Sequence, residues 1–170
     1  MKKLFILNLL SLILFPAFLS GQITTKQAGL RTGYRGGIFM QMTHEAGSAE
    51  IGYNAMLGFS NNGLQLTGLR IIYETSLSEI SPDLYFAWGY GGHVGFMYTD
   101  HIGFLGERYN FQGDRFVPLF GADGWLAAEY RFRDVPLHIS LNIKPFVELS
   151  VPAFIKIMPG DLGVSISYIF

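Results

Sequence analysis

The sequence predicts an all-β fold, a closed eight-stranded antiparallel transmembrane β-barrel, and three observations support this. Of the 170 residues, 49% are hydrophobic and only 15% are charged, and the mean hydropathy is +0.29. After residue 22 the apolar residues repeat with period two, as in strands, and never keep a helical period for three turns. The polar face is mainly Gly, Ser, Thr and Asn, whereas a soluble barrel needs dense charge on that face.

The composition also excludes several classes of protein. Twelve Lys and Arg residues against thirteen Asp and Glu residues give a net charge of −1, so we expect no nucleic-acid partner. The absence of Cys excludes a disulfide framework, a thiolate metal site and a cysteine nucleophile. The aromatic content of 15% argues against a disordered chain.

The first segment predicts export. Two lysines precede an apolar run, Leu4–Leu19, which contains Pro16 and is followed by two small residues. This pattern predicts a signal peptide over residues 1–21 and a barrel domain over residues 22–170. The alternative, an uncleaved anchor, needs roughly 20 apolar residues, and this run is shorter. An exported chain without Cys favours the bacterial cell envelope.

The number of strands depends on the stretch 28–43, which reads as one long strand or as two strands broken at 35–37. The longest predicted loops, 99–118 and 150–161, belong on one side of a membrane barrel. Only the two-strand reading of residues 28–43 places both loops outside the cell while both chain ends lie in the periplasm. The split also gives an even number of strands, so the prediction is eight.

The later strands follow from alternation of apolar and polar residues. They are predicted over residues 49–60, 64–74, 84–98, 119–132, 137–149 and 162–170. The second of these is irregular, because Leu64 and Leu66 have one phase while Leu69 and Ile71 have the other. A β-bulge at Gly68 is predicted to reconcile the two phases.

The apolar face is predicted to contact lipid and the polar face to fill the barrel. Aromatic girdles at the membrane interfaces are predicted from Trp88, Tyr90, Tyr98, Tyr130, Phe132, Tyr168 and Phe170. A paired charge network inside the barrel is predicted from Arg31, Glu50, Arg70, Glu74, Asp123, Glu129, Arg131, Lys144 and Glu148. The alternative is a soluble periplasmic β-sandwich, whose core would be the same apolar faces.

The last strand, GVSISYIF, is the most specific element of the sequence, and further elements are GLRTGYRGG, LQLTGL, GYGGHVGF, AAEYRFRDVPL and ISLNIKPFVEL. In their order and spacing these elements resemble the small outer-membrane β-barrels of OmpA/OmpX type. In the last strand Tyr168 and Phe170 resemble the signal that the barrel-assembly machinery recognises. The resemblance implies an outer-membrane location, with outer-membrane lipid and that machinery as partners. It implies no single activity, because such barrels include structural proteins, adhesins and a few lipid enzymes.

Candidate chemistry is sparse, and the first expectation is a non-enzymatic structural or surface-interaction role. No pair among His44, His93, His101 and His138 has a metal-binding spacing, so neither metal nor cofactor is expected. His138 and Ser140 share a strand face with Asn142 and Glu148. This arrangement is loosely similar to the Ser–His pair of lipid A deacylases, which faces lipid, whereas Lys144 marks this face as interior. A deacylase-like enzyme is therefore one alternative.

A narrow pore is a less favoured alternative, because an eight-stranded barrel leaves room only for its own side chains. The predicted outer loops carry more information. Residues 99–118 combine charges of both signs with aromatic residues, and residues 150–161 are apolar with a single Lys156. Both loops are candidate surfaces for an extracellular ligand, and the alternative is that they only pack over the barrel mouth.

Overall fold

The computed structural model describes residues 25–46, 49–60, 62–74, 77, 80–104, 107–150 and 154–170, so the predicted signal peptide lies outside the described residues. Within these ranges no helix has the length and apolar character needed to cross a membrane. The strands are β1 (Thr25–Arg31), β2 (Gly37–Ala46), β3 (Ala49–Ser60), β4 (Gly63–Glu74), β5 (Leu84–Phe104), β6 (Glu107–Arg131), β7 (Leu137–Ile143), β8 (Phe146–Ser150), β9 (Phe154–Met158) and β10 (Leu162–Ile169).

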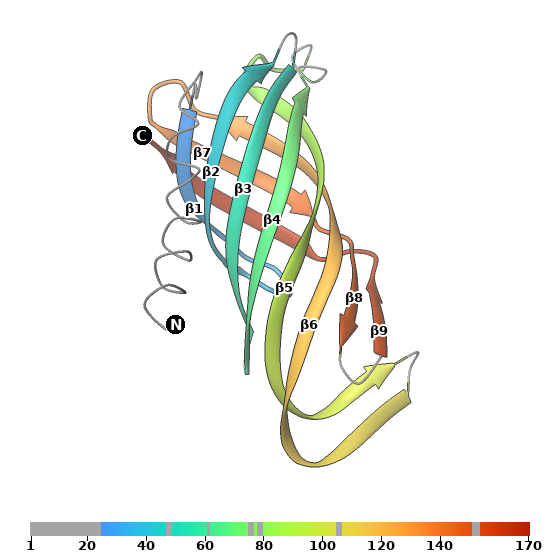
Figure 1. The fold of residues 1–170 in the computed structure, drawn as a ribbon. Helices are drawn as coiled ribbons and strands as arrows, with labels where there is room; N and C mark the ends of the chain where they lie inside the picture. The colour runs from blue at the N-terminus through green and yellow to red at the C-terminus, as the bar shows by residue number, and fades with distance from the viewer. Residues whose placement is uncertain are drawn as a thin grey trace, which may run out of the picture.

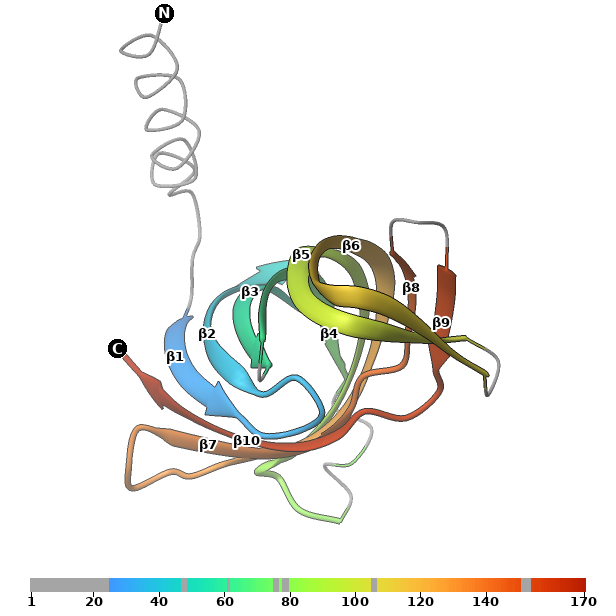
Figure 2. The same ribbon diagram turned by 90° about the horizontal axis from the view of Figure 1, so that it is seen from below.

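Eight of these strands form a ring. They are hydrogen-bonded in the order β5-β4-β3-β2-β1-β10-β7-β6, and pairing of β5 with β6 joins the two ends of that series (Figures 1 and 2). Every pairing is antiparallel. The all-β, eight-stranded prediction is therefore confirmed. The split of residues 28–43 is also correct, because β1 ends at Arg31 and β2 begins at Gly37.

The strands β8 and β9 lengthen two members of the ring. After the interruption at Lys144 and Pro145, β8 continues alongside β6, and β9 pairs with β8. The interruption suits a proline, which has no N–H group for a ladder hydrogen bond. Two main-chain hydrogen bonds hold the interruption, since Gly124 N donates to Pro145 O over 2.8 Å and Lys144 N donates to Asp161 O over 2.9 Å.

The two predicted outer loops are largely strands, so those predictions were wrong as to structure. Pairing of β5 with β6 continues to Phe104 and Glu107, with one irregularity between Thr99 and His101. The stretch 150–161 contains β9. Both hairpins extend from the same end of the ring, opposite the end where β1 begins and the C-terminus lies (Figure 1). These two ends are called the hairpin end and the termini end.

The bulge predicted at Gly68 is absent from the register. The strand β4 pairs continuously with β3 and with β5. Instead, Leu69, Ile71 and Tyr73 point into the barrel, where they form an apolar cluster with Ala87, Trp125 and Ala127. The change of phase therefore marks the point at which β4 begins to turn its apolar side chains inward.

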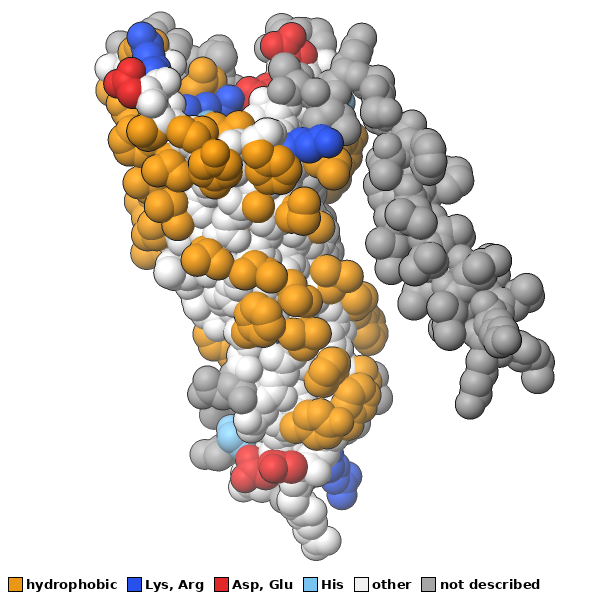
Figure 3. Space-filling view, turned by 90° about the vertical axis from the view of Figure 1, so that its left-hand side faces the viewer, with side chains coloured by type: hydrophobic (Ala, Val, Ile, Leu, Met, Phe, Trp, Pro, Cys, Tyr) orange, Lys and Arg blue, Asp and Glu red, His pale blue; other side chains and the backbone are white. Residues whose placement is uncertain are grey.

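The outer wall is hydrophobic around the ring. Large apolar side chains are exposed on every ring strand, and all seven predicted girdle aromatics are among them. Figure 3 shows these side chains covering the wall on one face of the molecule, with charged side chains gathered toward its two ends. Most polar residues of the same strands point inward and are buried, among them Gln41, Thr67 and Ser167.

Candidate functional site in the charged barrel interior

The interior holds two clusters of charged side chains. The hairpin-end network comprises Arg31, Arg35, His93, Asp123, Lys144, Glu148 and Asp161, and the termini-end network comprises Glu50, Glu129, Arg131 and His138. Because an unpaired charge in a low-dielectric interior is costly, each cluster pairs cations with carboxylates.

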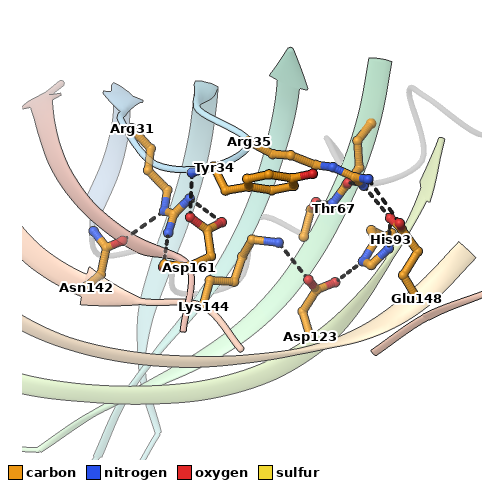
Figure 4. Close-up of polar contacts among 11 residues, drawn as sticks. Arg31, Tyr34, Arg35, Thr67, His93, Asp123, Asn142, Lys144, Glu148 and Asp161 are labelled. Atoms are coloured by element: carbon orange, nitrogen blue, oxygen red, sulfur yellow. Dashed lines mark hydrogen bonds and ion pairs between the residues drawn. The ribbon is translucent and has the colours of Figure 1, made fainter. Parts of the chain in front are cut away.

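The centre of the hairpin-end network is a chain of contacts running from Lys144 to Glu148 (Figure 4). Lys144 Nζ lies 2.7 Å from Asp123 Oδ1, and Asp123 Oδ2 lies 2.7 Å from His93 Nδ1. On the other side of the imidazole, His93 Nε2 lies 3.2 Å from Glu148 Oε2. Both imidazole nitrogens thus face carboxylates, and the imidazolium form, which donates from both nitrogens, satisfies both contacts.

Arg35 extends this chain from the turn between β1 and β2. Its guanidinium is ion-paired with Glu148, and Nη2 lies 3.0 Å from Glu148 Oε1. It also donates to Gln65, which in turn donates to Thr67 over 2.9 Å. Sequence reasoning missed Arg35 because it lies in a turn, where strand alternation assigns no face.

Arg31 connects the first strand to the last part of the chain. Its Nε donates to Asn142 Oδ1 over 2.8 Å, and its Nη1 lies 3.0 Å from Asp161 Oδ2. Two glycines make room for the guanidinium. A Cβ at Gly33, whose φ is +137°, would lie 2.7 Å from Arg31 Nη1, and one at Gly163 would lie 3.0 Å from Arg31 Cζ. Asp161 was missed because it fell within a predicted loop.

The termini-end network is organised by Arg131. Its Nη1 and Nη2 donate to the two carboxylate oxygens of Glu50 over 2.8 and 3.1 Å, and its Nε donates to Glu129 over 2.9 Å. The guanidinium lies between two tyrosine rings, with Cζ 4.6 Å from the Tyr73 centroid and 4.1 Å from that of Tyr85. This is a bidentate, ring-flanked geometry that suits arginine and not lysine.

Seven of the nine charges predicted to face the interior do lie there, and two do not. The interior ones are Arg31, Glu50, Asp123, Glu129, Arg131, Lys144 and Glu148. The prediction was wrong for Arg70 and Glu74, which lie on the outer face. Arg70 donates to Tyr90 Oη over 2.9 Å, and Glu74 accepts from Trp88 Nε1 over 2.8 Å. The prediction failed because a bulge at Gly68 would have turned Leu69 and Ile71 outward, and Arg70 and Glu74 would then have pointed inward.

The candidate catalytic residues are not brought together. His138 and Ser140 are buried in the barrel, where His138 lies beside Glu129 at 3.2 Å. Ser140 accepts a hydrogen bond from Asn142 Nδ2. Glu148 belongs to the other network, with Arg35 and His93 as partners. The structure therefore assembles no Ser–His–carboxylate relay from these three residues.

The interior holds a cavity of about 20 Å³ between the two networks. Gln41, Asn54, Trp125 and Ser140 contribute to its lining, and Asn54 Oδ1 there has no hydrogen-bond partner. Such a volume suits a single water molecule. Among the described residues, no group of three or more His, Asp or Glu side chains is placed to hold a metal ion.

Comparison with known proteins identifies the fold. No family model matches the sequence, and no curated protein matches it. Among solved structures, the chain is similar to the N-terminal β-barrel domain of Pseudomonas aeruginosa OprF, with a TM-score of 0.55 and 9% identity over 89% of this chain and 100% of that one. Acinetobacter baumannii CarO2 matches with a TM-score of 0.37 and 10% identity over 88% and 100%. The likeness to the β-barrel domain of OprF shows that this chain has the fold of a small β-barrel.

Proposed function

We propose that this protein is an integral barrel of the bacterial outer membrane with a structural or surface-interaction role. The observation that carries the proposal is the combination of a ring of paired strands with an outer wall of exposed apolar side chains. Hydrocarbon offers backbone groups no hydrogen-bond partners, so a barrel must satisfy them between its own strands. A soluble protein rarely exposes so large a continuous apolar surface.

The interaction role would belong to the hairpin end. There β5 and β6 project beyond the ring, and β8 and β9 form a second projection beside them (Figure 2). With the chain ends in the periplasm, both hairpins face the outside of the cell. We propose residues 99–118 and 150–161 as the surface for an extracellular ligand, and Tyr168 and Phe170 as the contact for the assembly machinery.

The two alternatives receive no support from the interior geometry. A deacylase would need its serine to meet lipid, whereas Ser140 lies inside the barrel wall. A pore would need a continuous channel, whereas Lys144, Trp125 and Phe146 fill the described interior and are at most 8% exposed. Planar-bilayer recordings without conductance steps are the expected result for the purified protein.

The proposal is tested by extracting the protein from outer-membrane fractions and comparing its gel mobility before and after boiling. A closed barrel resists detergent until heated, so two bands of different mobility are expected. A single band, from protein recovered in the soluble periplasmic fraction, would overturn the proposal. The apolar faces would then have to form a soluble core.

A further inference from the structure

Arg70 is a cation on an otherwise apolar part of the outer wall. In the sheet register it lies between Tyr53 on β3 and Tyr90 on β5. Its Nη1 donates to Tyr90 Oη over 2.9 Å, and both tyrosine rings are about half exposed. Within the described part of the chain Arg70 forms no ion pair with a carboxylate, although its guanidinium carries five N–H donors. Charged groups facing lipid are costly and commonly mark a binding function.

A groove lies directly beside this cation on the same outer wall. Its floor is the next register row toward the hairpin end, formed by Ala55, Gly68, Gly92, Ala122 and Val147. The groove measures about 730 Å³, and Leu66, Val94 and Phe120 stand along its far side. A second hollow of about 490 Å³ adjoins it and shares Ala55 and Leu66.

The groove exists because two of its floor residues have no side chain. A Cβ at Gly68 would have no atom within 4 Å, so the space above that position is open. Its lining is almost wholly apolar, since the side chains of Thr67 and His93, the two polar residues along it, are buried inside the barrel. An apolar groove that lies next to an unneutralised guanidinium has the shape and charge of a lipid site.

We propose that this surface binds an anionic phospholipid of the periplasmic leaflet. The phosphate would accept hydrogen bonds from the free N–H groups of Arg70 and from the hydroxyls of Tyr53 and Tyr90, while one acyl chain lies in the groove over Gly68. Guanidinium matches phosphate oxygens in a bidentate geometry. Arg70, Tyr53 and Tyr90 lie on the termini-end side of the groove. The assignment to the periplasmic leaflet therefore rests on the proposed function, in which the termini end faces the periplasm.

The test uses a tryptophan reporter in the groove wall. In the variant Leu66→Trp with Trp88→Phe, one tryptophan faces the groove and Trp125 stays buried inside the barrel. The protein is reconstituted into mixed vesicles of phosphatidylcholine and phosphatidylglycerol in which either the one lipid or the other is acyl-brominated. The two quenching values give the relative binding constant of the two lipids. We expect a roughly two- to fivefold preference for phosphatidylglycerol, the size of an exposed ion pair.

Added substitutions locate the site. Arg70→Gln should reduce the preference to about one, and Arg70→Lys should retain part of it. Arg133→Gln is the matched control, because it removes an equally positive but distant side chain in the β6–β7 turn, and it should change nothing. Gly68→Leu fills the groove and should also lower the preference. Heat-modifiability of every variant confirms that the barrel is intact.

The outcomes separate this proposal from the proposed function. Absence of quenching by brominated phosphatidylcholine itself would show that the outer wall does not contact lipid, and both proposals would fail. Quenching by every brominated lipid, with no preference for phosphatidylglycerol or with the same preference after Arg70→Gln, would refute the lipid site alone. The membrane barrel would stand in that case.

Discussion

The Nζ atom of Lys144 lies 2.7 Å from Oδ1 of Asp123, and neither side chain has any exposed surface. Lys144 stands where β7 is interrupted before Pro145, and its main-chain N–H donates to Asp161 O over 2.9 Å. The interruption thus places an ammonium group in the middle of the barrel. That ammonium depends on Asp123 and on the ring of Phe146, whose centroid is 4.9 Å away.

Removing this ammonium should strongly destabilise the barrel. Lys144→Met leaves Asp123 buried with only His93 as a partner, and breaking a buried pair costs about 3–5 kcal/mol. The measurement is the urea concentration at the midpoint of unfolding in detergent, with unfolding monitored by the change in gel mobility. Adding Asp123→Asn to Lys144→Met should recover part of the loss. A midpoint for Lys144→Met equal to that of the exposed control Arg133→Gln would contradict the prediction.

A methyl group at Gly121 should not be tolerated. A Cβ there would lie 2.3 Å from Val147 O and 2.5 Å from Cε1 of His93. Gly121→Ala should therefore cost about 1–3 kcal/mol, as overpacking does. The matched change is Gly68→Ala, where the added carbon meets open space. The prediction fails if thermal unfolding in detergent gives the same midpoint for both alanine variants.

Loss of Asp161 should loosen the turn between β1 and β2. Its Oδ1 accepts the Tyr34 main-chain N–H over 2.7 Å, and its Oδ2 holds Arg31. In Asp161→Ala, the Tyr34 amide should exchange its hydrogen at least tenfold faster, since a lost hydrogen bond to a charged group is worth roughly 1.5–3 kcal/mol. Amide exchange at Ile166, in the β1–β10 pairing, serves as the internal control. Equal protection of Tyr34 in both proteins would show that the contact is not significant in solution.

The orientation proposed for the barrel predicts which turns reach the cell surface. An epitope inserted between Phe104 and Glu107, at the tip of the β5–β6 hairpin, should bind antibody on intact cells. The same epitope inserted at Asp134, in the β6–β7 turn, should bind only after the outer membrane is permeabilised. The reverse pattern would show that the hairpins face the periplasm.

Alternation predicted most of the fold because side chains on a strand have period two. In β10 it separates exposed Leu162, Val164 and Ile166 from buried Ser165 and Ser167. It failed in β4 for a physical reason. There Leu66 faces outward and Leu69 faces inward on an unbroken strand, so apolar residues occupy both faces in turn. Alternation divides the residues of a strand between two faces. It does not show which face points inward when the interior contains both polar and apolar side chains.

The charged site was only partly predictable for a related reason. Lys144 and Glu148 lie within or beside alternating strands, so sequence pattern assigns their face. Arg35 and Asp161 lie in connections, and their inward direction depends on partners more than 100 residues away in the sequence. Neither local propensity nor spacing contains that information.

The pairing of Arg31 has a consequence for how the ring is completed. Its partners Asn142 and Asp161 are 111 and 130 residues away along the chain, so the guanidinium is neutralised only once the first and last strands have met. A chain that stalls with those strands apart retains an uncompensated cation at the unfinished seam. The contacts of Arg31 therefore stabilise only the completed ring, and they favour it over a barrel whose first and last strands have not yet paired. Joining of the seam should then be an abrupt, late event in folding, as expected when the decisive contacts are so distant in sequence.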